Sequence, residues 1–417
     1  MKLELTNPNY NCTVVRVNKL IELEGCDNVV AFPMFWLQAI TSKDTEVWGL
    51  YLMFSVEVEM SYDFCRNNNL HRHKELNIDE TKTWYMEDSR RVKAIKFRWH
   101  ESSALLMPLC SLDYLWVDTS KLVEWDTFNN IDWNVICSKY VVTSGVAKNK
   151  IKWSQKSFER INNRTFPEHL DSENYWRNKH KYKDDQRVIV TQKLHGTSGR
   201  WGNVLAKRKL WWFEQLLARV LPINDTAYDS IFWSRRVIKN WTASSHQQSF
   251  YSSDVWGVIN ERIKDVIPQD WIIYWEIVGW DWQKPIQSWY TYGVPQWEIE
   301  LYVYRISVVN QQWMSVDLSW DAIVEFCSLS WLNHVPLVWS WYHWDLDVDV
   351  YMDKNYSLSW YSNCVPLSNS QGVDEWVMVR SEWLLPFLTK AKCSKFLEHE
   401  TKSLDKWEVD MESDESI

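Results

Sequence analysis

Short alternating and apolar segments dominate the N-terminal third of the chain. Residues 13–17 (Thr-Val-Val-Arg-Val) alternate, and residues 50–56 form a nearly continuous apolar run. Residues 92–98 alternate apolar with basic side chains, so one face of that strand is cationic. Short strands separated by turns are typical of a small β-barrel of the oligonucleotide-binding (OB) type, and a generic β domain with a solvated lysine face fits equally well.

The pattern becomes mixed beyond residue 165. Residues 188–191, 271–274, 301–304 and 377–379 are short apolar runs that predict strands. A helix that Pro222 ends is predicted where apolar residues recur at helical spacing, namely at Leu210, Phe213, Leu216, Leu217 and Val220.

These patterns predict an α+β protein of four parts. Residues 1–145 form an OB-like β-barrel, residues 146–165 form a polar and basic linker, and residues 166–400 form a mixed α+β domain. Residues 401–417 form an acidic tail that we expect to be disordered. A chain of 417 residues is too long for a single ordinary core, which agrees with two folded domains.

Composition narrows the class of protein. No run approaches the ~18 apolar residues that span a membrane. The eight cysteines are scattered without a Cys-x-x-Cys pair, which argues against zinc and disulfides and fits a reducing compartment. The net charge of −9 means that any nucleic-acid surface is a local patch. We therefore expect a cytoplasmic monomer with no membrane partner.

The usage of tryptophan and glycine is abnormal. The chain has 31 Trp and 10 Gly, whereas average usage predicts roughly 29 Gly for this length. Trp233, Trp289 and Trp297 stand in turn-like stretches, where glycine is the usual residue. Some bacterial lineages and their phages read the UGA codon as glycine, while a common alternative table reads it as tryptophan. Our hypothesis is that many of these tryptophans are glycine in the cell; a truly Trp-rich protein is the alternative.

Lys193 is the candidate nucleophile. It follows the apolar strand over residues 188–191 and begins the turn Lys-Leu-His-Gly. Lysine is a poor nucleophile while it is protonated, so it must be desolvated or lie near other cations. A strand that ends at a glycine-containing turn can expose such a lysine in a cleft. The four-residue pattern alone is weak, and a solvated lysine is the alternative.

The surrounding residues carry a resemblance to a known family. Residues 193–199 (Lys-Leu-His-Gly-Thr-Ser-Gly) resemble motif I of the RNA ligase 2-like group of ATP-dependent RNA ligases, within the covalent nucleotidyltransferases. Five further segments resemble later motifs in the correct order: residues 234–236 (Ia), 274–279 (III), 301–304 (IIIa), 375–380 (IV) and 390–396 (V). Residues 67–70, 90–96 and 166–171 resemble the OB-first subgroup, so the likeness covers nearly the whole chain.

The resemblance implies three nucleotidyl transfers. Lys193 attacks the α-phosphate of ATP and forms lysyl-AMP; the adenylate moves to an RNA 5′-phosphate; a 3′-hydroxyl then attacks and releases AMP. Glu375 is the expected ligand of Mg²⁺ (or Mn²⁺), because hard cations prefer carboxylate oxygen. His195 is expected to contact substrate or shape the turn, and Gly196 is assigned to the nucleotide site. Tyr304 stacks on adenine or packs in the core.

Further residues are assigned to AMP or ATP. Lys390 and Lys392 alternate on one strand face, where they can neutralise the α-phosphate; an exposed lysine run is the alternative. Glu276 is expected to accept a hydrogen bond from a ribose hydroxyl, with a surface glutamate as the alternative. Arg235 or Arg236 is expected to hold phosphate in a bidentate fork, and the sequence does not distinguish the two.

The predicted function is an ATP-dependent RNA ligase that joins 3′-hydroxyl to 5′-phosphate ends. RNA or a nicked duplex that contains RNA is the expected partner, and repair is preferred because OB-first relatives are associated with such nicks. A capping-type enzyme is disfavoured by His195 and by the N-terminal OB module. A catalytically inactive nucleic-acid-binding protein is favoured by Trp275 and Trp376, which stand where motifs III and IV carry glycine. If both are glycine, that objection disappears.

Overall fold

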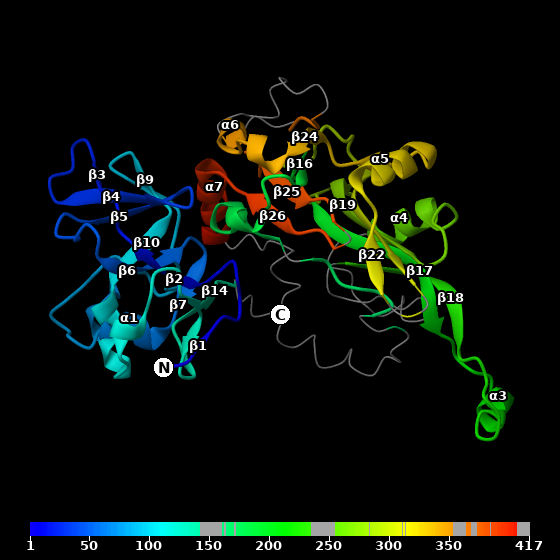
Figure 1. Ribbon diagram of the computed structural model, residues 1–417, viewed down its shortest axis with the longest axis horizontal. Coiled ribbons are helices and arrows are strands. Elements are labelled where there is room, and N and C mark those ends of the chain that lie inside the picture. Colours follow the sequence, from blue (N-terminus) through cyan, green and yellow to red (C-terminus); the bar gives the residue numbers. More distant parts are fainter. Residues whose placement is uncertain are drawn as a thin grey trace. The chain divides into compact units, whose positions relative to one another are not determined.

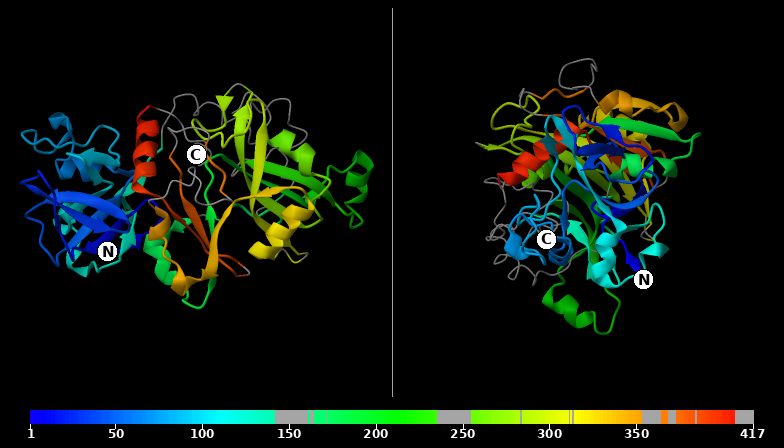
Figure 2. Two further views of the ribbon diagram at one scale, coloured as in Figure 1. Left: turned by 90° about the horizontal axis from the view of Figure 1, so that it is seen from above. Right: turned by 90° about the vertical axis from the view of Figure 1, so that its left-hand side faces the viewer.

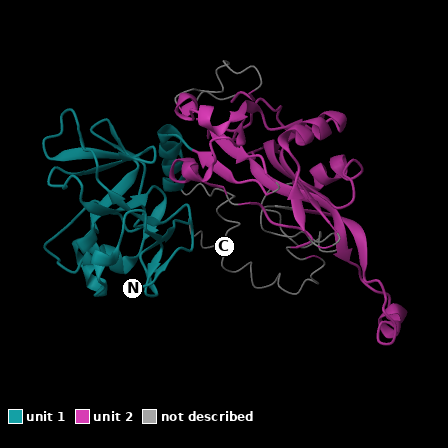
Figure 3. Cartoon of the chain, in the orientation of Figure 1, with its two compact units in different colours: residues 1–142, 392–409 teal, residues 143–391, 410–417 magenta. Residues whose placement is uncertain are grey.

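The computed structural model describes residues 1–141, 161, 164–170, 172–234, 255–282, 284–310, 312, 314–352, 364–367, 373–383 and 385–406. The chain divides into two compact units (Figure 3). Unit 1 comprises residues 1–142 and 392–409, and unit 2 comprises residues 143–391 and 410–417. Residues 392–400, assigned above to the second domain, thus group with the N-terminal unit.

Unit 1 is built on a seven-stranded sheet with the strand order β11-β2-β6-β10-β5-β4-β3. The strands are β2 (Cys12–Arg16), β3 (Ile21–Glu22), β4 (Val29–Met34), β5 (Leu37–Ser42), β6 (Leu50–Ser55), β10 (Ala104–Pro108) and β11 (Thr127–Phe128). Smaller sheets are formed by β1 (Leu3–Glu4), β12 (Asn130–Ile131) and β13 (Asn134–Val135), by β7 (Val58–Met60) and β14 (Cys137–Lys139), and by β8 (Ile95–Phe97) and β9 (His100–Ser102). The helical segments are α1 (Tyr62–Asn67), η1 (Lys74–Leu76), η2 (Leu109–Leu115), η3 (Thr119–Lys121) and α7 (Ser394–Asp405).

The main sheet of unit 1 is buried on both faces. Val14 packs with Leu52 and Phe54 in one cluster, whereas its neighbour Val15 packs with Phe32 in another. Successive side chains of a strand point to opposite faces, so a strand covered on both sides is apolar at consecutive positions. This explains the nearly continuous apolar run that predicted β6.

The α+β class predicted from the sequence is confirmed, as are the strands predicted as β2 and β6. A closed OB-like barrel is not found: among the described residues, the edge strands β3 and β11 are not paired with each other. The local pattern of short strands does not encode whether two edges meet, because that pairing joins residues distant in sequence.

Helix α7 completes the core of unit 1. Leu397 packs in the same cluster as Val15 and Phe32, and Thr401 donates a hydrogen bond to Glu57 at 2.8 Å. Residues 401–405 are therefore helical, contrary to the expectation of a disordered tail from residue 401 onwards. Residues 407–417 of that tail lie outside the described residues.

The basic strand predicted over residues 92–98 is shorter and more neutral than expected. β8 spans Ile95–Phe97, and two lysines of this stretch are paired with carboxylates. Lys93 contacts Glu87 at 2.7 Å and Asp405 at 2.9 Å, and Lys96 lies 3.6 Å from a third carboxylate, on Glu398 of α7. The acidic face of α7 thus offsets part of the cationic stripe.

Unit 2 contains two sheets. The five-stranded sheet has the order β15-β26-β25-β16-β24, and the second runs β18-β17-β19-β21-β22, with β20 paired to β19 and β23 paired to β21. The strands are β15 (Glu173–Asn174), β16 (Arg187–Gln192), β17 (Thr197–Lys207), β18 (Thr226–Ser234), β19 (Trp271–Asp281), β20 (Lys284–Pro285), β21 (Ile299–Val309), β22 (Ser315–Asp317), β23 (Asn333–His334), β24 (Leu337–Tyr342), β25 (Val377–Ser381) and β26 (Leu388–Ala391). The helical segments are α2 (Tyr175–Asn178), η6 (Lys179–Lys181), α3 (Trp212–Leu217), α4 (Val255–Ile263), α5 (Trp320–Leu329), η8 (His343–Asp345) and α6 (Asp349–Met352).

The elements predicted for unit 2 are present in the structure. The strands predicted around residues 188–191, 271–274, 301–304 and 377–379 are confirmed as β16, β19, β21 and β25. The predicted helix is confirmed as α3, which projects from the ends of β17 and β18 in all ribbon views (Figures 1 and 2). No helix among the described residues is long and apolar enough to cross a membrane.

Candidate functional site

Lys193 lies at the connection between the two sheets of unit 2. β16 ends at Gln192, and residues 193–196 lead directly into β17 of the other sheet. β16 runs antiparallel to β25, with Gln192 opposite Val377. The backbone N–H of Lys193 donates to the carbonyl oxygen of Trp376 at 2.7 Å, which extends this ladder by one residue. Strand pairing therefore brings the predicted motifs I and IV together.

Glu375 joins Lys193 and His195 in one polar cluster. Lys193 Nζ lies 2.6 Å from Glu375 Oε2, and His195 Nδ1 lies 3.2 Å from the same oxygen. The side chains of Lys193 and Glu375 are 18% and 4% exposed, so the ion pair is largely shielded from water. Shielding strengthens the attraction between the charges and raises the cost of removing either partner. The predicted nucleophile and the predicted metal ligand thus share one site.

Glu276 holds the turn that carries the nucleophile. Its Oε1 accepts from the backbone N–H of Gly196, and its Oε2 accepts from the hydroxyl of Ser198, both at 2.8 Å. Strand pairing sets this geometry, because Ser198 of β17 lies opposite Glu276 of β19. Gly196 is required there, since a Cβ would lie 2.2 Å from the carbonyl oxygen of Ile277. The carboxylate anchors the turn, and its predicted contact with a ribose stays a prediction.

Three residues that sequence reasoning missed also support this turn. The hydroxyl of Tyr292 accepts from the backbone N–H of His195 at 2.8 Å, and Gln287 donates to the carbonyl oxygen of Gly196 at 3.1 Å. The ring of Tyr290 meets the His195 ring edge to face, with centroids 4.6 Å apart. Burial raises the pKa of Tyr292 well above its usual value, so its hydroxyl stays neutral. In the sequence, the only sign of this supporting role is that aromatic and amide residues are frequent just after β20.

Comparison with known proteins gives one kind of match. No family model matches the chain. No curated protein matches it either. Solved structures of Naegleria gruberi RNA ligase do match. A variant with ATP and Mn has a TM-score of 0.56 over 95% of this chain and 99% of that chain, at 12% identity. An apo variant has a TM-score of 0.58 over 94% and 99%, at 12% identity. The protein with PPi has a TM-score of 0.55 over 94% and 98%, at 13% identity.

The chain has the fold of these RNA ligases. The match extends over both units, which agrees with the sequence resemblance across nearly the whole chain. At 12% identity the likeness establishes the fold.

Within this RNA-ligase fold, Tyr304 lies on β21 and packs against a core cluster. Its hydroxyl is 2.6 Å from Nδ1 of His169, in the segment predicted to lead into the catalytic domain. The His169 ring contacts Tyr274 edge to face, with centroids 5.1 Å apart. Tyr304 is partly buried beside Phe166 and Tyr274 in this cluster. The structure thus gives Tyr304 a packing role, and stacking on adenine stays a prediction.

The two lysines of predicted motif V have different surroundings. Lys390 lies on β26, opposite Met378 of β25, in the sheet that also carries β16. Lys392 follows β26, and its Nζ lies 3.0 Å from both carboxylate oxygens of Glu400 on α7. Lys392 Nζ also lies 4.9 Å from the ring centroid of Phe396. The predicted contact of these two lysines with the α-phosphate stays a prediction.

The remaining predicted ligands are a metal ligand and two arginines. No cluster of three or more His, Cys, Asp or Glu side chains suited to a metal exists in the described part of the chain. Glu375 as a single carboxylate fits Mg²⁺, which is usually held by one or two carboxylates together with substrate phosphates and water. Arg235 and Arg236 lie outside the described residues.

Proposed function

We propose that this protein is an ATP-dependent RNA ligase that forms a covalent lysyl-AMP on Lys193. The observation that carries the proposal is the shielded contact of 2.6 Å between Lys193 and Glu375. This contact lies in a turn anchored by Glu276, within a fold shared with RNA ligase structures that hold ATP, AMP or PPi. The nucleophile and the carboxylate lie together where two paired strands end and begin, an arrangement that suits nucleophilic catalysis.

The ion pair explains how the nucleophile is controlled. A carboxylate at 2.6 Å stabilises the ammonium form of Lys193, which has no lone pair for attack. We propose that Glu375 holds a divalent cation, which supplies positive charge to the phosphates when bound. A divalent cation bound at Glu375 would draw that carboxylate away from Lys193. In the proposed step, Lys193 Nζ loses a proton to solvent and forms the N–P bond to the α-phosphate as the P–O bond to pyrophosphate breaks.

The proposed overall reaction joins an RNA 3′-hydroxyl to a 5′-phosphate. The adenylate on Lys193 passes to the 5′-phosphate, and the 3′-hydroxyl displaces AMP. We propose nicked duplexes that contain RNA as the substrate and repair as the role. Support comes from the sequence resemblance to OB-first RNA ligases; unit 1, whose fold is built on a seven-stranded sheet, is the proposed RNA-binding module.

Covalent labelling tests the first step. The protein is incubated with Mg²⁺ and α-labelled ATP or GTP, and covalent label is measured after denaturation. We expect label from ATP that disappears in Lys193→Ala. Lys264→Ala is the matched control, because Lys264 is an exposed lysine directly after α4 that pairs with Glu261. Label from GTP alone, or equal label in Lys193→Ala, contradicts the proposal.

A second candidate function rests on a specific observation. Trp275 is fully buried beside Glu276, and Trp376 is 4% exposed beside Glu375. Bulky indoles at both carboxylates favour a catalytically inactive protein of the same fold that still binds RNA. That candidate predicts RNA binding without label from any nucleotide.

A further inference from the structure

Eleven tryptophans among the described residues have a left-handed backbone. Their φ angles run from +50° to +100°, at Trp36, Trp48, Trp99, Trp116, Trp125, Trp133, Trp282, Trp289, Trp297, Trp331 and Trp376. Side chains with a Cβ rarely adopt such angles, and glycine adopts them without steric cost. We propose that all eleven positions are glycine in the native protein, because the source organism reads as glycine the codon that is translated as tryptophan in this sequence.

The other aromatic residues provide an internal control. The chain has 19 Tyr and 14 Phe, comparable in bulk to its 31 Trp. Among the described residues, only Tyr292 and Phe35 of these two types have a left-handed backbone, compared with eleven tryptophans. A general tendency of this fold to place aromatic residues in turns would affect all three types alike. The excess is specific to tryptophan.

Three hairpins show the same substitution. Phe35-Trp36 joins β4 to β5, Arg98-Trp99 joins β8 to β9, and Asp132-Trp133 joins β12 to β13, each as a two-residue turn. Both residues of each turn have positive φ. This geometry is the type I′ turn, whose preferred sequences end in glycine, as in Asn-Gly and Asp-Gly. Tryptophan stands at the glycine position in all three.

A helix end repeats the pattern. Ser330 caps the C-terminus of α5, and the next residue, Trp331, has φ +57°. The N–H of Leu332 then donates to the carbonyl oxygen of Cys327 at 2.9 Å. This is the Schellman arrangement, in which the residue after the cap is usually glycine. Trp331 is 95% exposed, so no burial of its indole offsets the backbone strain.

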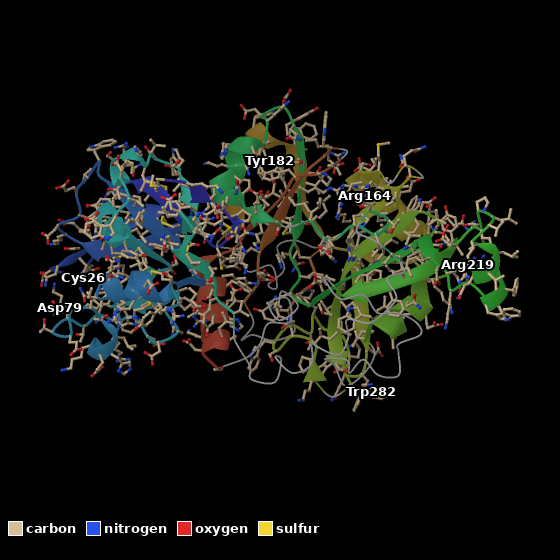
Figure 4. The ribbon with its side chains drawn as sticks, turned by 90° about the horizontal axis from the view of Figure 1, so that it is seen from below. Cys26, Asp79, Arg164, Tyr182, Arg219 and Trp282 are labelled. Carbon is tan, nitrogen blue, oxygen red and sulfur yellow. The ribbon has the colours of Figure 1, made fainter. Side chains whose placement is uncertain are left out.

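Three other members of the set are also exposed. Trp99 and Trp116 are 92% and 96% exposed. Trp282, labelled in Figure 4, is 59% exposed at the surface. Exposed indoles gain little from the hydrophobic effect. These residues therefore combine a left-handed backbone with little burial of the indole, which is the environment of a glycine.

Trp376 extends the inference to the candidate site, and this step rests on the proposed function. Its φ of +100° is the largest of the eleven, and its carbonyl oxygen accepts from Lys193. Glycine at this position lets a phosphate approach the backbone next to Glu375, where an indole blocks it. Trp275 lacks a positive φ, but its buried Nε1 has no hydrogen-bond partner among the described residues. The left-handed backbone therefore assigns glycine to position 376, whereas position 275 has no such backbone.

Peptide masses of the protein isolated from its source test the proposal directly. We expect glycine masses in peptides that cover positions 99, 133, 331 and 376. Tryptophan masses at these positions would overturn it.

The physical basis is tested in the recombinant chain. We expect Trp331→Gly to raise Tm by about 2–4 °C, because glycine removes the strain of the left-handed backbone and the exposed indole contributes no buried surface. Trp331→Ala is the matched control: it removes the indole but keeps a Cβ, so it should recover little of the gain. Trp341→Gly, at an exposed position of β24, should lower Tm. An equal gain in the alanine variant, or no gain with glycine, contradicts the assignment.

A full-length protein with glycine at all eleven positions separates this inference from the proposed function. We expect a higher Tm and a higher yield of covalent label from ATP than for the tryptophan chain. A higher Tm without label supports the glycine assignment and contradicts the ligase. An unchanged or lower Tm overturns the glycine assignment, whatever the label.

Discussion

Replacing Glu276 with glutamine should loosen the turn that carries Lys193. Glu276 accepts two hydrogen bonds at 2.8 Å, from Gly196 and Ser198, and is 6% exposed. Glutamine keeps the shape and one acceptor oxygen, but its amide group faces the other donor. Losing a charge-assisted bond and leaving a buried donor unsatisfied costs about 2–4 kcal/mol. For a unit of this size that lowers Tm by roughly 4–16 °C.

Differential scanning calorimetry of the full chain measures this loss. Ser198→Ala removes one of the two donors, so the double variant should lose less than the sum of the single variants. At temperatures below Tm, where the variant is folded, the yield of covalent label from ATP should also fall, because the turn no longer holds Lys193 in place. A Glu276→Gln protein with unchanged Tm, or strictly additive losses in the cycle, refutes the view that Glu276 anchors the turn.

Three further predictions concern other parts of the fold. Gly196→Ala should abolish labelling and lower Tm, since its Cβ would lie 2.2 Å from the carbonyl oxygen of Ile277; normal labelling contradicts the close approach. Burial raises the pKa of Glu57 from 4.5 to about 7, so the folded chain binds this proton more tightly than the unfolded chain. Its stabilising effect is complete below pH 4.5 and is lost as pH rises towards 7, and Glu57→Gln should flatten this slope in denaturation curves across that range. Asp317→Ala should destabilise unit 2 by about 3–5 kcal/mol in urea unfolding, because it leaves the buried charge of Arg305 unpaired, whereas a loss below about 1 kcal/mol counts against a buried ion pair.

Local patterns predicted the strands that carry the site. β16 and β25 were visible as short apolar runs, and Lys193 was placed at the end of the first. The pairing of these two strands was not predicted by the local patterns, because the strands lie far apart in the sequence. Once they pair antiparallel, Lys193 after β16 and Glu375 before β25 lie close together. The turn after β16 contains a glycine that the structure shows to be sterically required. Sequence and structure agree there because both depend on the same short segment.

Long-range partners were out of reach of the sequence. Tyr290 and Tyr292 contact His195 from almost a hundred residues away, and no periodicity marks them. Leu397 and Thr401 of α7 are buried in unit 1, although the sequence placed residue 397 in the second domain and residue 401 at the start of a disordered tail. The partners of α7 lie more than 300 residues earlier in the chain. Contacts of this kind depend on tertiary packing, which single-sequence patterns do not contain.

The site of nucleotide attachment tests the central claim most directly. The full-length variant with glycine at all eleven left-handed tryptophan positions is incubated with Mg²⁺ and ATP. It is digested under conditions that keep a phosphoramidate intact and mapped by tandem mass spectrometry. We expect an AMP adduct on the peptide that contains Lys193, and no adduct on that peptide in Lys193→Ala. An adduct on a different lysine, or no adduct in a folded protein, contradicts it.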